Sequence, residues 1–210
     1  MAEVSCNSEA CCDVTTATGA ASVSGPVAPL TNYDVFLNHR GPDVKRGFLD
    51  HLAASLESVG VRSFVDRKDL HGGDTTWDAI QSAIHRSKVH IAIFSPLYAS
   101  SKWCLDELLE ILECRTNGCS LLFLPVFFNV NPSDLRYSSS PKSCYSDAFA
   151  KLLVRHDEET ILSWRNALHE ASMVTGKTFD KAEGICGNSG LWAVIIFAKS
   201  FPTSASVVRN

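Results

Sequence analysis

The sequence has little excess charge of either sign and no long hydrophobic run, and each absence excludes a class of partner. Its 210 residues include 19 Lys and Arg against 23 Asp and Glu, a formal net charge of −4. It therefore lacks the polybasic surface typical of nucleic-acid binding. The apolar run at residues 191–198 is too short for a bilayer, which takes about 20 residues. We expect a soluble protein with neither a membrane nor a nucleic-acid partner.

The usual signatures of metal binding and secretion are also missing. No cysteine pair has C-x-x-C spacing, and the seven histidines show no His-x-x-x-His pairing, so no metal is expected. Cys104, Cys114 and Cys119 fall in or near one apolar helix, which favours a reduced intracellular protein over a disulfide scaffold. Residues 1–32 contain no basic residue and no sustained apolar run, which excludes a standard secretory signal and predicts a disordered lead-in. We predict a cytoplasmic location and leave nuclear entry open.

One short segment, VTGKT at 174–178, superficially suggests a nucleotide-binding phosphate loop. Such a loop needs a glycine five residues before Gly176, where this sequence has Ala171. The segment also follows a predicted helix, whereas the motif follows a strand. No phosphate loop is therefore predicted.

Short apolar runs alternate with amphipathic helices from Tyr33 onward. Strands are predicted at 33–37, 61–65, 89–94 and 120–128. Helices are predicted at 44–60, 77–87, 100–112 and 160–171, and a turn-rich loop at 129–147. This alternation indicates an α/β fold with a parallel sheet and helices on both faces. A ligand crevice is expected beyond the carboxyl ends of the strands, where the loops 38–43, 66–75 and 95–103 would meet.

The helix SSKWCLDELLEIL, residues 100–112, has an apolar stripe and an unusual opposite face. The stripe consists of leucines at helical spacing: Leu105, Leu108, Leu109 and Leu112. Ser101 is a candidate N-cap. Trp103 and Glu107 stand together on the opposite face, where the indole would stack on an aromatic ligand. The Glu107 carboxylate would stabilise positive charge at the anomeric carbon of a bound sugar. The alternative is an ordinary solvated carboxylate.

A further candidate is Arg40, in the first of the three loops. Its guanidinium can hold a phosphate through two hydrogen bonds. The alternative is an ordinary surface arginine.

Several segments together resemble the plant Toll/interleukin-1 receptor (TIR) domain family. YDVFLNHRGPDV (33–44) is similar to the first box of the family, and SSKWCLDELLEIL to the helix that carries its catalytic glutamate. LPVFFNVNPSDLR (124–136) and WRNALHEAS (164–172) resemble two later plant motifs. The resemblance implies a flavodoxin-like sheet of about five strands. It divides the chain into a lead-in at 1–32, a TIR domain at 33–176 and a tail at 177–210. The tail either supplies the last strand or is loosely attached. A TIR-only protein is expected, because no nucleotide-binding or leucine-rich segment follows in this sequence.

The family resemblance also implies an activity. Many plant TIR domains cleave NAD⁺, releasing nicotinamide and forming ADP-ribose-type or cyclic products that act in immune and cell-death signalling. The implied substrate is NAD⁺, with NADP⁺ as an alternative, and no separate cofactor is needed. The resemblance places the catalytic carboxylate on Glu107 and a substrate-lining aromatic on Trp103. Arg40 and Gly41 match first-box residues that approach the nucleotide, and we count Ser101 among the residues near the substrate.

Self-association is the second implication of the resemblance. His71 falls in the loop after the second strand, which in the family closes the site, often across a protomer interface. The composition of the loop 66–75, rich in charge and glycine, favours docking on a partner. The expected enzyme is active as a homo-oligomer and contacts other TIR domains. Plant members often carry Ser-His at a self-association face on the first helix, where this chain has Asp50 and His51.

Two functions of different class remain open at this point. The first is an NAD⁺ glycohydrolase, and the second is a catalytically inactive adaptor that recruits other TIR proteins. The presence of Glu107, Trp103 and Arg40 favours the enzyme, because an adaptor has no need of that combination.

Overall fold

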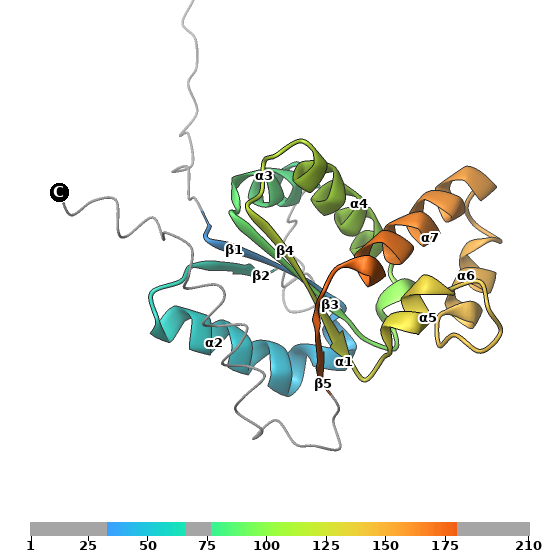
Figure 1. The fold of residues 1–210 in the computed structure, drawn as a ribbon, viewed down its shortest axis with the longest axis horizontal. Coiled ribbons are helices and arrows are strands. Elements are labelled where there is room, and N and C mark those ends of the chain that lie inside the picture. The colour runs from blue at the N-terminus through green and yellow to red at the C-terminus, as the bar shows by residue number, and fades with distance from the viewer. Residues whose placement is uncertain (1–32, 66–76, 180–210) are drawn as a thin grey trace, which may run out of the picture. The chain divides into compact units, whose positions relative to one another are not determined.

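One parallel sheet organises the chain. A computed structural model describes residues 33–65 and 77–179. The sheet has five strands in the order β2-β1-β3-β4-β5, all paired in parallel (Figure 1). The strands are β1 (Val35–His39), β2 (Ser63–Val65), β3 (Val89–Phe94), β4 (Leu122–Phe128) and β5 (Lys177–Phe179). The predicted α/β class and the predicted number of strands are confirmed.

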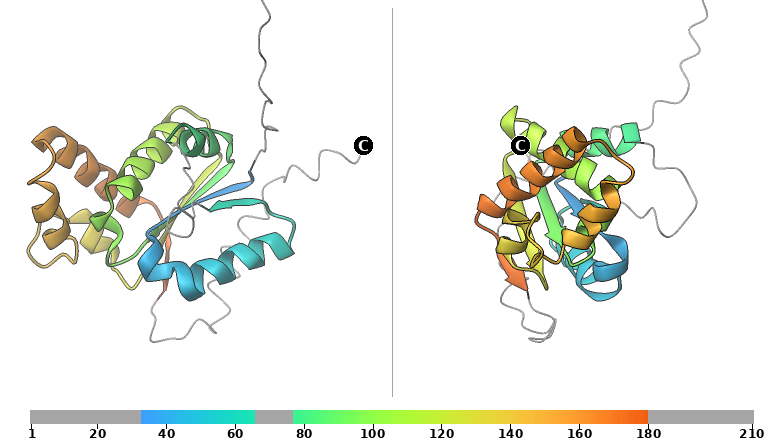
Figure 2. Two further views of the ribbon diagram at one scale, coloured as in Figure 1. Left: turned by 180° about the vertical axis from the view of Figure 1, so that it is seen from behind. Right: turned by 90° about the vertical axis from the view of Figure 1, so that its right-hand side faces the viewer.

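Helices cover both faces of this sheet. They are α1 (Gly41–Val44), η1 (Lys45–Leu49), α2 (Asp50–Ser58), α3 (Trp77–Arg86), η2 (Tyr98–Ser100), α4 (Lys102–Thr116), α5 (Pro132–Arg136), α6 (Ser146–Leu152) and α7 (Glu158–Met173). Helix α2 lies on one face, and α3 and α4 lie on the other (Figures 1 and 2). Within the described ranges, no helix has the length and apolar character needed to cross a membrane.

Side chains of β1 alternate between these two faces, and this alternation positions the site. Val35 and Leu37 pack in the core beneath α2, whereas Phe36 packs in the core shared with α3 and α4. Successive side chains of a strand point to opposite faces. Asn38, two residues beyond Phe36, therefore faces α4 at the carboxyl end of its strand.

The first helical segment differs from the prediction of one helix over 44–60. It is divided into α1, the π-helical turn η1 and α2. Gly47 lies in the middle of η1 with φ of 138°, a conformation that interrupts an α-helix and that glycine adopts at little cost. The predicted end is correct, because Gly60 has φ of 80° and its N–H donates to the Glu57 carbonyl at 2.9 Å.

The predicted loop at 129–147 contains the short helix α5 and the first two residues of the short helix α6, so that prediction is wrong in part. Pro132 occupies the first turn of α5, where its missing N–H costs nothing. The carboxylate of Asp134 accepts a hydrogen bond from the Asn131 backbone N–H at 2.9 Å, which stabilises the helix start. Neither helix is long enough to show the apolar periodicity by which the longer helices were recognised.

The fifth strand lies just beyond the predicted domain boundary at residue 176. Residues 177–179 pair with β4 in the register Val126 to Lys177 through Phe128 to Phe179. Of the two alternatives for the tail, this stretch therefore supplies the last strand. The predicted lead-in at 1–32, the loop position His71 and the tail from residue 180 lie outside the described residues.

Gly176 allows β5 to approach β4, and we expect Gly176→Ala to destabilise the fold. A Cβ at this position would lie 2.3 Å from the Pro125 carbonyl oxygen and 2.8 Å from its Cγ. Overpacking of this kind costs about 1–3 kcal/mol, so the melting temperature should fall by about 2 °C or more. Thermal unfolding followed by circular dichroism measures the change. The neighbouring exposed Thr175→Ala is the control, and equal stability of the two variants would contradict the prediction.

Candidate active site

Glu107 is buried, which corrects the prediction that it stands on the outer face of its helix. Only 4% of it is exposed. The leucine stripe is buried as predicted at Leu105 and Leu108, but α4 also contacts α3, α7 and β1. Because neighbours surround α4 on more than one side, the part of the opposite face that carries Glu107 is buried as well, whereas Trp103 is exposed. The carboxylate of Glu107 lies against the sheet and not in bulk water.

Asn38 of β1, which sequence reasoning missed, is a hydrogen-bond partner of Glu107. The Asn38 Nδ2 donates to Glu107 Oε2 at 2.9 Å and lies 3.3 Å from the Cys104 carbonyl oxygen. The hydroxyl of Tyr98 donates to Asn38 Oδ1, and it lies 3.0 Å from the same Cys104 carbonyl. Asn38 and Tyr98 are fully buried. This network orients the amide of Asn38 so that its N–H group faces the carboxylate.

Tyr98 keeps its proton over the physiological range. Burial, with smaller contributions from Cys104 and Glu107, raises the pKa of Tyr98 well above its ordinary value. The neutral hydroxyl remains a donor to Asn38 Oδ1, and this contact fixes which end of the amide meets Glu107.

One feature of the sequence could have identified Asn38 as a site residue. It is an asparagine at the end of a buried strand, and ligands of parallel sheets bind at that edge.

Trp103 lies one helical turn before Glu107 on α4 and is 47% exposed. Its ring centroid is 6.2 Å from that of Trp77, at an interplanar angle of 42°. Trp77 begins α3, is half-buried and packs against the core shared by α3 and α4. The indole is thus part of a pair of tryptophans at the surface, and it remains accessible to a ligand.

Arg40 and Gly41 directly follow β1. Gly41 is buried at the start of α1, and Arg40 is half-buried. The Nε of Arg40 is buried, and it has no hydrogen-bond partner among residues 33–65 and 77–179. A guanidinium nitrogen without a partner, two residues beyond Asn38, is suited to an anionic ligand.

Two other predicted site residues have different outcomes. Ser101 is the N-cap of α4, as predicted, and its Oγ accepts a hydrogen bond from the Cys104 backbone N–H at 3.4 Å. Its contact with a substrate stays a prediction. His71 belongs to the segment between β2 and α3 that lies outside the described residues.

A hollow of about 540 Å³ along β2, lined by Arg62, Phe64 and their neighbours, includes none of the predicted site residues.

Comparisons with known proteins agree with this fold. A family model for the TIR domain matches residues 32–201. The chain is 37% identical over 159 residues to the TMV resistance protein N of Nicotiana glutinosa, covering 74% of this chain and 14% of that protein. It is 38% identical over 156 residues to the disease resistance protein RPV1 of Vitis rotundifolia, covering 74% of this chain and 11% of that protein. This chain therefore spans a small part of the curated relatives that it matches.

One solved structure extends the comparison to three dimensions. The TIR domains in the structure of the activated Roq1 resistosome that directly recognises the pathogen effector XopQ superpose with a TM-score of 0.65. The two sequences are 33% identical, and the match covers 80% of this chain and 99% of that chain.

Proposed function

Because the chain belongs to the TIR domain family, we propose that it is an NAD⁺ glycohydrolase that acts in plant immune signalling. The observation that carries this proposal is the buried carboxylate of Glu107, held by the Asn38 amide at 2.9 Å. Burying a carboxylate costs free energy that a solvated side chain would avoid. A buried, oriented carboxylate at the carboxyl edge of a parallel sheet is better explained by a catalytic role than by a contribution to the stability of the fold.

The reaction breaks the bond between the nicotinamide nitrogen and the anomeric carbon of its ribose. The bonding electrons leave with nicotinamide, which departs as a neutral molecule, and positive charge develops on the ribosyl carbon. Glu107 stabilises that charge, because a fixed anion shielded from water acts more strongly than one in bulk solvent. The oxygen of a water molecule then bonds to the anomeric carbon, its proton passes to solvent, and ADP-ribose results.

Arg40 is the proposed anchor for the pyrophosphate of NAD⁺. Its buried Nε lacks a partner in the described part of the chain, and two phosphate oxygens would satisfy the guanidinium. Holding the phosphates at the end of β1 would orient the ribose toward Glu107. Proximity of this kind lowers the entropic part of the barrier.

Self-association is part of the proposal. The similarity to TIR domains within a resistosome supports an enzyme that works as an assembly with other TIR domains. Asp50 and His51, at the start of α2, are both exposed and therefore accessible to a neighbouring protomer.

Nicotinamide release from NAD⁺ by the purified protein tests the proposal. We expect release measurable by chromatography, with a specific activity that rises with protein concentration across a dilution series. Light scattering on the same samples reports the assembly. If no nicotinamide appears at any concentration, with or without a crowding agent, the adaptor function replaces the enzyme.

Trp103→Ala should weaken substrate use through the loss of ring stacking. Aromatic stacking contributes about 1 kcal/mol, so kcat/KM should fall about fivefold. Trp103→Phe keeps an aromatic face and should lose less. Steady-state kinetics on the two variants measures the difference, and wild-type kinetics in both would remove the indole from the site.

A further inference from the structure

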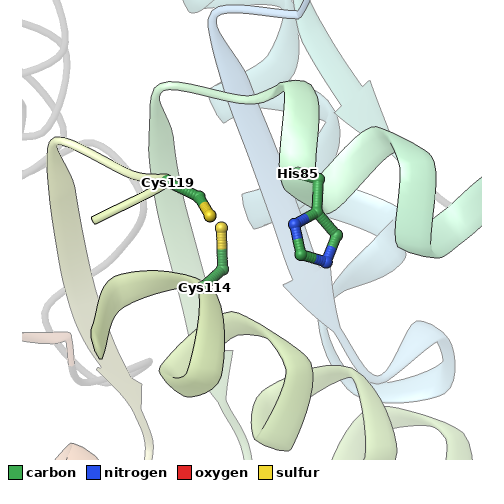
Figure 3. A group of neighbouring side chains, drawn as sticks. All are labelled: His85, Cys114 and Cys119. Carbon is green, nitrogen blue, oxygen red and sulfur yellow. The ribbon is translucent and has the colours of Figure 1, made fainter. Parts of the chain in front are cut away.

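Three metal-ligating side chains meet at the far end of α4. They are His85 in the last turn of α3, Cys114 in the last turn of α4, and Cys119 just after α4. Their ligand atoms all lie within 4.8 Å of one another. In Figure 3 the two sulfur atoms face each other, and one ring nitrogen of His85 points toward them. Such a distance allows one small cation to contact all three groups.

A supporting network orients His85. The Nε2 of His85 lies 2.5 Å from Glu110 Oε1, and the Gln81 side-chain amide donates to Glu110 Oε2 at 3.1 Å. A carboxylate partner at Nε2 keeps the proton on that nitrogen, so the lone pair of a neutral ring lies on Nδ1. The nitrogen that faces the sulfurs in Figure 3 is this Nδ1. Metal-bound histidines typically donate their second ring N–H to a carboxylate in this way.

The backbone holds the two cysteines together without a disulfide. Gly118 adopts φ of 73°, and the Cys119 N–H donates to the Cys114 carbonyl oxygen at 2.9 Å. Both cysteines are free thiols in this structure. Cys114 is fully buried, whereas His85 and Cys119 are exposed. One side of the cluster is therefore open to solvent, which leaves a path for an ion.

We propose that His85, Cys114 and Cys119 form a zinc site whose fourth position is taken by water. Two thiolates and one imidazole suit a borderline-soft cation such as Zn²⁺, which binds such ligands tetrahedrally. On binding, two S–H bonds are replaced by two zinc–sulfur bonds, and both protons go to solvent. Sequence reasoning missed this site because it considered C-x-x-C and His-x-x-x-His, whereas Cys114 and Cys119 are spaced C-x₄-C and the histidine comes from another helix.

Oxidation to a Cys114–Cys119 disulfide is the competing outcome. A disulfide would engage the two sulfur atoms alone, whereas a ring nitrogen of His85 also lies within 4.8 Å of both of them. This third ligand favours metal binding over disulfide formation.

Zinc titration of the full-length, reduced, metal-free protein against a chromophoric chelator tests the proposal. The informative variant is Cys119→Ser, and the matched control is the exposed Cys144→Ser, which lies away from the cluster. We expect wild type and Cys144→Ser to bind one more zinc ion per chain than Cys119→Ser does. The cysteines other than Cys119 and Cys144 are common to all three proteins, so a loss of zinc in Cys119→Ser but not in Cys144→Ser reports this site alone. Equal stoichiometry and affinity in Cys119→Ser and wild type would overturn the proposal.

Two further readouts make the result specific. With Co²⁺ in place of zinc, wild type should show thiolate-to-cobalt charge-transfer absorption, and Cys119→Ser should lose it. Glu110→Gln should weaken zinc binding about tenfold, because it removes the negative partner of His85. Unchanged affinity in Glu110→Gln, or a disulfide in place of bound zinc under reducing conditions, would contradict the proposed site. None of these readouts depends on NAD⁺ cleavage.

Discussion

Glu107→Gln is expected to reduce nicotinamide release by at least about 100-fold, the scale of losing one preorganised electrostatic contact in an active site. Glutamine keeps the size and shape of glutamate and can still accept the hydrogen bond from Asn38. What it loses is the negative charge that opposes the positive charge on the ribosyl carbon. The effect should therefore appear in kcat, with little change in KM.

The stability of the same variant provides its control. A neutral amide in a buried position avoids the cost of burying a charge, so Glu107→Gln should melt at or above the wild-type temperature. Glu107→Ala is a less informative variant. It leaves Asn38 Nδ2 without its acceptor at 2.9 Å, which costs about 1–3 kcal/mol of stability. Wild-type turnover in a well-folded Glu107→Gln would remove Glu107 from the mechanism.

Asn38→Ala is expected to lower turnover by about 10-fold or more, because the Glu107 carboxylate loses a buried donor that orients it. Asn38 is a positioning residue, and its effect should depend on Glu107. In a double-mutant cycle, Asn38→Ala should cause no further loss of activity when Glu107 is already glutamine. Nicotinamide release by the two single variants and the double variant measures this coupling.

Tyr98→Phe separates positioning from stability. This variant removes the hydroxyl that donates to Asn38 Oδ1 but keeps both acceptors of Asn38 Nδ2, Glu107 Oε2 and the Cys104 carbonyl oxygen. Tyr98→Phe and Asn38→Ala both remove buried hydrogen bonds, and each lost bond lowers the stability of the fold by about 1 kcal/mol. If Tyr98→Phe and Asn38→Ala lose activity in proportion to their loss of stability, the role of Asn38 is structural.

The architecture of this protein was accessible from local patterns in its sequence. Predominantly apolar runs such as 89–94 indicated strands covered on both faces, and amphipathic spacing indicated the helices between them. These patterns are local because apolar residues that share one face of a helix or strand recur with the period of that element, which a short stretch of sequence already shows. The same patterns placed Arg40 and Glu107 beside the carboxyl edge of the sheet. Short elements such as α5 and α6 escaped notice because they contain too few residues to establish a period.

The burial of Glu107 and its pairing with Asn38 were decided by tertiary structure. A helical pattern distinguishes an apolar face from a polar one, but it does not show that α4 packs against β1 and α3 at once. The carboxylate and the amide that holds it are 69 residues apart in the chain. The cluster of His85, Cys114 and Cys119 has the same origin, since the turn after α4 and the end of α3 meet only in the folded chain. Periodicity reports what each element buries, whereas contacts between elements depend on how those elements pack.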